Sequence, residues 1–462
     1  MTGMSLRKAW ASLGLLLAVT AASPAWAAPT DVDAATAQID AVTARHHVQF
    51  LADDKLEGRA AGSPGGRAAA AYIVRRLEAC GLRPGGTGTG ADAWFQEFTR
   101  DGVTCRNIVA VREGADPARR GEHVLLGAHY DHLGRGESGN AIPTLAELLG
   151  QEKGEIHNGA DDNASGSAAL LECAKAFAAL DPGPARTVVL VWFDGEERGL
   201  WGSHHYVDAP ARPLATCVGM VNMDEVGRAR DGHVQLIGAN SGRGLVELVQ
   251  RENRGIGLTI DVDPYMVPNS DHFSFYSHDV PVAFFFTGLH PDYHRPTDDW
   301  QKVNHVDMAR VAKLAFRTAA RLAGAPDRPA FAKIPEAPPG ALVLEFAYGF
   351  TGSDLLLEVQ RDAYGPIAGA FVKAGLGSLD VDYVIPGSPA DSAGIQPGDR
   401  ISRANGRAMS GIGARIRLLL LARNAGSLNV ELSRGGEKRK VAIQLGGAPR
   451  PSQPRTKEAS AF

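Results

Sequence analysis

The sequence has few cysteines, no excess of positive charge and, beyond its N-terminus, no long hydrophobic run. Its 462 residues include only four cysteines, and the formal net charge is −4. A protein that binds nucleic acid through phosphates usually carries a basic patch or stripe, and this composition predicts none. Glycine is abundant, at 54 residues, but has no regular period, which excludes a collagen-like repeat. We therefore expect a globular protein without a nucleic-acid partner.

The N-terminus has the pattern of a secretory signal. Arg7 and Lys8 precede an apolar run at 9–22, and the Ala-Trp-Ala at 25–27 has the form of a cleavage site. The run is shorter than the about 20 residues that a membrane-spanning helix needs. No cysteine follows it that could carry a lipid, and no later stretch is apolar enough to cross a bilayer. We expect cleavage after Ala27 and a secreted or periplasmic protein without a membrane span.

The cysteines allow two interpretations. In an oxidising compartment four thiols can pair in three ways. Buried free thiols explain them equally well, because all four lie in apolar helix or strand patterns. None has the spacing of a zinc finger. The four residues are Cys80, Cys105, Cys173 and Cys217.

The length of the chain predicts two or three domains. A hydrophobic content of 44% and a charged content of 22% are typical of globular proteins. Residues 325–340 contain five prolines and no periodicity, which indicates a semi-rigid linker. The predicted division is a signal peptide at 1–27, a first domain at 28–324, the linker at 325–340, a second domain at 341–446 and a disordered tail at 447–462.

Strand and helix patterns alternate through the first domain. This alternation predicts an α/β fold with a mostly parallel sheet flanked by helices. In such sheets ligands bind beyond the carboxyl ends of the strands. The predicted elements are helices at 41–53 and 64–80, strands at 107–111 and 123–126, a loop with a short helix at 144–149, helix 164–180, strand 187–193, helix 199–207, strand 217–222, helices 244–253 and 271–278, strand 281–286 and helix 307–323.

Two adjacent carboxylates, Asp161 and Asp162, precede the helix predicted at 164–180. They belong to the stretch Gly-Ala-Asp-Asp-Asn-Ala-Ser-Gly at 159–166. One short polar residue is enough to cap a helix, and here three occur in a row. We therefore expect Asp161 to be a carboxylate that bridges two metal ions.

Other potential ligands follow predicted strands. His129 has Asp131 two residues later, and a carboxylate beside a ligating imidazole commonly fixes its tautomer. A lone histidine is more often a hydrogen-bonded core residue, but the nearby acidic stretch favours a ligand. Glu196 and Glu197 follow a fully apolar strand, so their side chains point in different directions. One can bind metal while the other acts as general base; a solvated acidic pair is the alternative.

Asp224 follows the next strand, and His294 lies in a polar loop before the last helix. In this order, the His-x-Asp, the acidic stretch, the Glu-Glu pair, the strand-end Asp and the late His resemble the di-zinc aminopeptidase family. Its relatives include glutamate carboxypeptidase, glutaminyl cyclase and the transferrin receptor ectodomain. The resemblance covers about residues 45–323.

The resemblance implies a zinc exopeptidase fold with two zinc ions per chain. One zinc would take His129, Asp161 and Asp224. The other would take Asp161, Glu197 and His294, so that Asp161 is shared.

The implied reaction is hydrolysis of the N-terminal peptide bond of peptides by a hydroxide that bridges the metals. Glu196 would be the general base, and Asp131 would orient the first histidine ligand. A cis peptide bond would join Asp161 to Asp162. Four further residues could contact the substrate or support the site: Asp162, Tyr265, Asp271 and His272.

Three other functions stay open. A non-catalytic, peptide-binding ectodomain would have lost metal ligands, and none of the five is missing. A glutaminyl cyclase-like acyltransferase is expected to use one zinc and to lack the first histidine, so His129 argues against it. A carboxypeptidase would need a basic pocket for the terminal carboxylate, which the sequence does not show.

The second domain resembles a PDZ domain, which is small and mainly β. The resemblance lies in Gly375, Leu376 and Gly377 before a strand pattern, and then in Ser-Pro-Ala at 388–390, Ala-Gly at 393–394 and Gly-Asp at 398–399. A hairpin is predicted separately at 428–445. In PDZ domains such a loop binds a peptide carboxylate, and the peptide adds to the sheet edge. The expected partners are thus peptide substrates in the first domain and a peptide C-terminus or protein ligand here. A domain that only packs on the first is the alternative.

Overall fold

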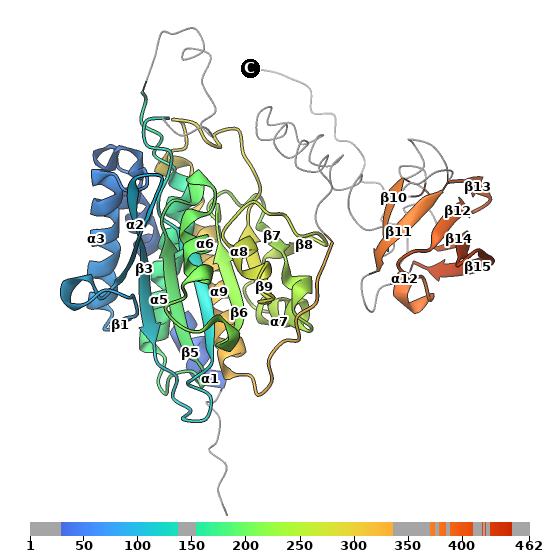
Figure 1. The fold of residues 1–462 in the computed structure, drawn as a ribbon, viewed down its shortest axis with the longest axis horizontal. Coiled ribbons are helices and arrows are strands. Elements are labelled where there is room, and N and C mark those ends of the chain that lie inside the picture. The colour runs from blue at the N-terminus through green and yellow to red at the C-terminus, as the bar shows by residue number, and fades with distance from the viewer. Residues whose placement is uncertain are drawn as a thin grey trace, which may run out of the picture.

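The computed structural model describes residues 29–136, 154–335, 370–374, 378–384, 389–409, 418, 421 and 426–445. These residues form a large α/β domain and a small β domain (Figure 1). The helix predicted at 144–149 and the carboxylate loop predicted at Gly375, Leu376 and Gly377 lie outside the described residues.

A mixed sheet of nine strands forms the centre of the first domain, counted over its described residues. The strand order is β1-β3-β5-β4-β6-β9-β7-β8, with β2 paired to β3. The four central strands, β5, β4, β6 and β9, are parallel, whereas β3 and β7 pair antiparallel at either side of them. The strands are β1 (Arg83–Pro84), β2 (Phe95–Arg100), β3 (Val103–Arg112), β4 (His123–His129), β5 (Thr187–Phe193), β6 (Cys217–Met223), β7 (His233–Ile237), β8 (Thr259–Val262) and β9 (Val282–Phe286).

Helices cover both faces of this sheet, because alternate strand residues are apolar on each side. In β5, Val188, Leu190 and Trp192 pack into the same core as α2, α3, α5 and α9. Their neighbours Val189 and Val191 pack on the other face with α6 and α8. The helices are α1 (Pro29–Thr36), α2 (Ala41–Leu51), α3 (Pro64–Ala79), α5 (Gly166–Ala179), α6 (Trp201–Asp208), α7 (Leu245–Glu252), α8 (His272–Tyr276) and α9 (His305–Gly324).

The predicted α/β fold is confirmed, and the sheet is parallel only at its centre. Strands β1, β2, β7 and β8 were not predicted. Because the four central strands run the same way, their carboxyl ends lie at one edge of the sheet. The residues that follow β4, β5, β6 and β9 therefore gather there.

The second domain contains an antiparallel sheet of six strands among its described residues. The predicted hairpin is present as β14 and β15, and Leu428, Val430 and Leu432 of β14 are buried in its core. The elements are β10 (Ala370–Ala374), β11 (Leu379–Val384), α12 (Pro389–Ser392), β12 (Arg400–Ala404), β13 (Arg407–Ala408), β14 (Ser427–Arg434) and β15 (Glu437–Gln444).

All four cysteines are free thiols in this structure. Among the described helices, none combines the length and the apolar character that crossing a membrane requires.

Candidate active site

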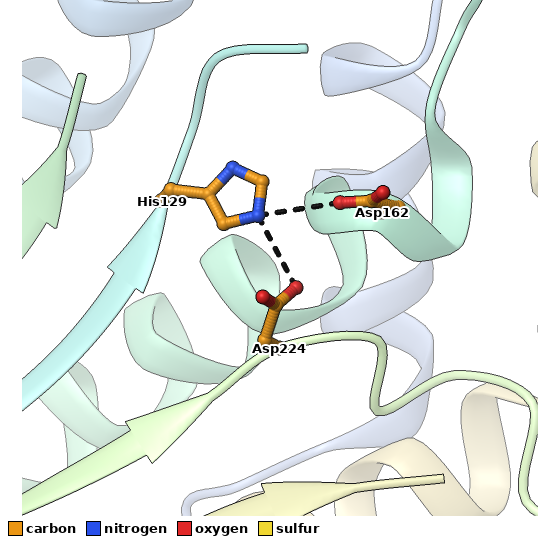
Figure 2. Close-up of side chains that lie close together, drawn as sticks. All are labelled: His129, Asp162 and Asp224. Carbon is orange, nitrogen blue, oxygen red and sulfur yellow. Dashed lines mark hydrogen bonds and ion pairs between the residues drawn. The ribbon is translucent and has the colours of Figure 1, made fainter. Parts of the chain in front are cut away.

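A first group of potential metal ligands comes from three separate segments at the carboxyl edge of the sheet (Figure 2). It consists of His129 at the end of β4, Asp162 in the turn before α5, and Asp224 just after β6. His129 Nε2 lies 3.2 Å from Asp162 Oδ1 and 3.2 Å from Asp224 Oδ1. Three buried donor atoms thus converge on one point.

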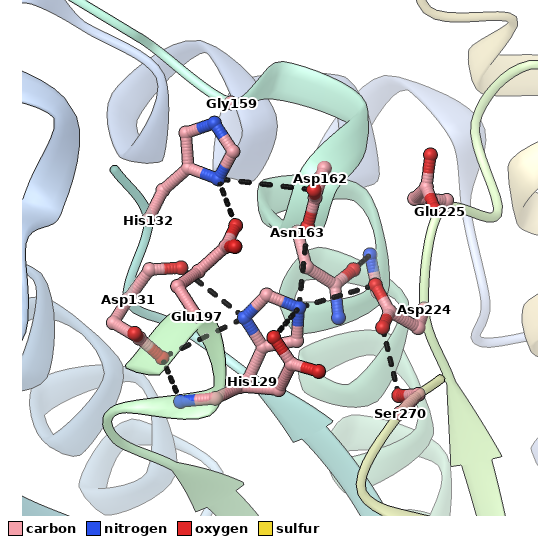
Figure 3. Close-up of polar contacts among 12 residues, drawn as sticks. His129, Asp131, His132, Gly159, Asp162, Asn163, Glu197, Asp224, Glu225 and Ser270 are labelled. Atoms are coloured by element: carbon pink, nitrogen blue, oxygen red, sulfur yellow. Dashed lines mark hydrogen bonds and ion pairs between the residues drawn. The ribbon is translucent and has the colours of Figure 1, made fainter. Parts of the chain in front are cut away.

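A second group, His132, Asp162 and Glu197, shares Asp162 with the first. Within it, His132 Nδ1 lies 2.6 Å from Glu197 Oε1 (Figure 3). The predicted ligand His294 adjoins this group, with Nε2 3.0 Å from Asp162 Oδ2 and 3.3 Å from Glu197 Oε2. The carboxylate of Asp162 therefore faces a histidine of each group with a different oxygen.

The shared carboxylate is Asp162, and the prediction that Asp161 occupies this position is wrong. Asp161 points to another loop, where its Oδ2 lies 3.2 Å from His290 Nε2 and its Oδ1 accepts a hydrogen bond from Gly227 N. The backbone amides of both aspartates donate to Asp298 Oδ2, at 2.8 and 3.2 Å, which fixes the turn. The cis peptide bond is displaced by one residue as well, since it joins Asp162 to Asn163.

Gly159 makes room for this turn. Its φ of 55° is in the left-handed region, which favours glycine. A Cβ atom at this position would lie 2.1 Å from Asp162 O and 2.4 Å from His132 Cδ2. The site therefore requires the absence of a side chain here.

We expect Gly159→Ala to lower both stability and metal binding. The left-handed backbone alone costs a non-glycine residue about 1–3 kcal/mol, and the clash displaces Asp162 or His132. Gly81→Ala is the matched control, because Gly81 has a φ of +74° with nothing within 4 Å of its added Cβ. Thermal unfolding and metal analysis of both variants test this. Equal metal content in the two variants would contradict the role assigned to Gly159.

Neighbouring groups hold the first group in place (Figure 3). His129 Nδ1 lies 3.2 Å from the Asp131 carbonyl oxygen and 3.6 Å from its Oδ1. Ser270 Oγ donates to Asp224 Oδ2 at 2.7 Å. These contacts orient the imidazole and the carboxylate, so that His129 Nε2 and Asp224 Oδ1 face the proposed metal position.

Glu196 lies beside the two groups. Its Oε2 is 3.9 Å from His129 Nε2, and its amide donates to Asp131 Oδ1 at 3.1 Å. Its side chain is 12% exposed, compared with 3% for Glu197. Burial raises the pKa of Glu196 well above its usual range; His129 opposes this shift, and Glu197 adds to it. Glu196 is the more accessible carboxyl of the pair.

Arg59 is a buried guanidinium beneath the site. It donates to the carbonyl oxygens of Leu51, Tyr130, Asn158 and Gly159, at 2.5 to 3.0 Å. Burial lowers its pKa to about 10, and nearby carboxylates oppose this shift. The nitrogen atoms of one guanidinium group thus connect the end of α2 and the loop after β4 to the turn before α5.

The arrangement fits bound cations. Five buried or nearly buried carboxylates face imidazoles, and buried charges are normally paired or coordinate a metal. Burial opposes ionisation of Asp162, yet His132, His129 and His294 hold its pKa well below the usual range. One imidazole with carboxylates is a ligand set that zinc accepts. The five carboxylates are Asp131, Asp162, Glu196, Glu197 and Asp224.

Three other predicted site residues lie outside the metal groups found among the described residues. The His272 ring stacks on Phe284, and burial lowers its pKa to about 3. Asp271 is buried, which raises its pKa to about 7; His129 opposes that shift. Tyr265 is buried and lies in the segment that connects β8 to α8; its backbone amide donates a hydrogen bond to Asp263 Oδ1. Their contact with substrate stays a prediction.

The sequence interpretation missed four residues near the site. His132 and Glu225 carry the same signal as the predicted ligands, because they follow β4 and β6 within three residues. His290 lies four residues before His294 in the same loop. Arg59 gives no such signal, since it comes from a turn far from any central strand.

Two segments of the chain match known protein families. Residues 107–319 match Peptidase family M28, and residues 381–434 match the PDZ domain family. The chain is 28% identical to leupeptin-inactivating enzyme 1 of Streptomyces exfoliatus, over 62% of this chain and 56% of that protein. It is 28% identical to aminopeptidase YwaD of Bacillus subtilis (strain 168), over 45% of this chain and 42% of that protein. The chain thus spans about half the length of these curated relatives.

The fold is similar to that of a solved structure, the LapA aminopeptidase of Legionella pneumophila. The TM-score is 0.52 at 20% sequence identity, and the match covers 70% of this chain and 81% of that one. At this identity the likeness concerns the fold.

Proposed function

We propose that the chain is an exported zinc aminopeptidase with two zinc ions, because residues 107–319 match peptidase family M28 and residues 381–434 match the PDZ domain family. The observation that carries this proposal is the carboxylate of Asp162, which presents Oδ1 to His129 and Oδ2 to His294, at 3.2 and 3.0 Å. A carboxylate used from both sides is suited to bridging two ions.

The ligands would divide into two sets around Asp162. His129 and Asp224 would complete one, and Glu197 and His294 the other. Zinc ions bound there would polarise a peptide carbonyl and lower the pKa of water from about 16 to about 7. His132 would hold Glu197 in place through its 2.6 Å contact to Oε1.

Glu196 would be the proton carrier. Its Oε2 would accept a proton from the attacking water and deliver it to the nitrogen of the departing amine. The hydrogen bond from its amide to Asp131 ties its backbone to the residue that orients His129. One aspartate thereby positions both the proton carrier and a metal ligand.

The acidic surroundings favour a substrate with a free N-terminus. The α-ammonium group of a peptide would be attracted by the acidic side chains that surround the site, whereas a C-terminal carboxylate would find no basic side chain among the proposed site residues. This argues for an aminopeptidase rather than a carboxypeptidase.

The PDZ domain would bind a peptide C-terminus or a protein ligand, as other domains of its kind do. The signal pattern at residues 1–27 supports the proposed export. Mass spectrometry of the purified exported protein would test cleavage after Ala27, because the cleaved protein would lack the mass of residues 1–27.

Substrate chemistry tests the main proposal. We expect the purified protein to hydrolyse peptides with a free N-terminus and to leave N-acetylated copies of the same peptides intact. A chelator should abolish this activity, and added zinc should restore it. Equal cleavage of free and blocked peptides would refute the aminopeptidase assignment, and full activity in chelator would refute the metal mechanism.

A further inference from the structure

A third group of potential ligands lies next to the first two and has no part in the proposed mechanism. It consists of Asp161, Glu225 and His290, whose donor atoms all lie within 4.8 Å of one another. His290 Nε2 is 3.2 Å from Asp161 Oδ2 and 3.8 Å from Glu225 Oε1. Figure 3 draws Glu225 without a contact to the other residues shown.

The three side chains are buried and their facing atoms lack hydrogen bonds. Asp161, Glu225 and His290 are 0%, 6% and 1% exposed. Within the described part of the chain, Asp161 Oδ2, Glu225 Oε1 and both ring nitrogens of His290 have no hydrogen-bond partner. A buried polar atom without a partner costs about 1–3 kcal/mol, and more when it is charged. Three of these atoms, Asp161 Oδ2, Glu225 Oε1 and His290 Nε2, face one another, which indicates that a ligand belongs between them.

The local charge indicates that this ligand is a cation. Two carboxylate oxygens, Asp161 Oδ2 and Glu225 Oε1, face the same imidazole nitrogen of His290, at 3.2 and 3.8 Å, so acidic oxygens line the space between the three side chains.

We propose that Asp161, Glu225 and His290 bind a third divalent metal ion, separate from the two at Asp162. One imidazole and two carboxylates suit zinc or manganese, whereas an all-oxygen site would suit magnesium or calcium. Each ligand is a near neighbour of a proposed ligand of the two-ion centre, because Asp161 precedes Asp162 and Glu225 follows Asp224. The third ion would therefore link three of the segments that carry proposed ligands of the two-ion centre, those of Asp162, Asp224 and His294.

The competing explanation is a protonated His290 that forms an ion pair with Asp161. It accounts for the 3.2 Å distance without any metal. It predicts that removal of the imidazole leaves the number of bound ions unchanged.

The test counts ions in the full chain after chelation, reloading with Zn²⁺ alone and dialysis. We expect three ions per chain in the parent protein and two in His290→Gln. In an Asp162→Asn background, which lacks the shared ligand, we expect one ion, and none once His290→Gln is added. The same series with Mn²⁺ shows which of the two metals the site prefers.

His123→Gln is the matched control. His123 is a buried histidine at the start of β4, with Nδ1 3.1 Å from Thr216 Oγ1, and it lies at the opposite edge of the sheet. This variant should bind as many ions as the parent. If His290→Gln fails to fold by near-ultraviolet circular dichroism, Glu225→Gln gives the same decision.

A His290→Gln or Glu225→Gln chain that binds as many ions as the parent overturns the third site, whatever that number is. If the proposal of a two-ion centre at Asp162 is wrong, Asp162→Asn will not remove two ions, whereas His290→Gln will still remove one. The two proposals can therefore fail independently.

Discussion

Asp162→Asn is expected to release both ions of the two-ion centre and to reduce peptide hydrolysis to background. Asp162 is the carboxylate that faces both His129 and His294, so its replacement weakens two sites at once. The amide nitrogen of asparagine cannot coordinate a cation, and its neutral side chain no longer offsets the charge of the ions. Zinc analysis beside hydrolysis of an unblocked peptide measures the two effects together.

Asp161→Asn is the natural control, because it changes the adjacent carboxylate in the same way. Its side chain faces His290, so this variant should keep the two ions at Asp162 and stay active. It should lose only the third ion. The reverse outcome, in which Asp161→Asn loses the pair of ions and Asp162→Asn keeps them, would restore the sequence-based assignment and contradict the geometry.

Glu196→Gln should reduce kcat by about 10²–10⁴-fold, the usual contribution of a positioned general base. The substitution keeps the volume and removes the group that carries the proton. Glu196 lies 3.9 Å from His129 Nε2, farther than Asp162 and Asp224. Zinc content and thermal stability should therefore stay close to those of the parent.

Glu197→Gln provides the contrast for this variant. Glu197 contacts both His294 and His132, at 3.3 and 2.6 Å, so its replacement should lower zinc content together with activity. Metal analysis and steady-state kinetics of the two purified variants decide between the roles. Loss of zinc from Glu196→Gln with retention in Glu197→Gln would show that the assignment is reversed.

The central strands could be predicted from the sequence because their burial leaves a clear pattern. β5 is apolar on both faces, and the predicted bounds of 187–193 match the structure. The Glu pair comes directly after it, and the general rule for parallel sheets then places that pair at the ligand edge. The same reasoning located His129 and Asp224.

The remaining features depend on contacts that a local pattern does not contain. β7 and β8 are short, and β8 is only partly buried, so its periodicity is weak. The choice between Asp161 and Asp162 depends on the turn that Asp298 fixes from a loop 137 residues away. Two identical neighbouring side chains cannot be told apart without that turn.

The hydrogen bonds of Arg59 bear on where the catalytic module begins. The segment that matches the peptidase family starts at residue 107, yet this guanidinium, 48 residues upstream of that boundary, binds the carbonyl oxygens of Asn158 and Gly159 just before the acidic turn. A segment that began at residue 107 would leave the carbonyl oxygens of Tyr130, Asn158 and Gly159 without this donor. The structural unit that holds the acidic turn therefore extends back at least to Arg59.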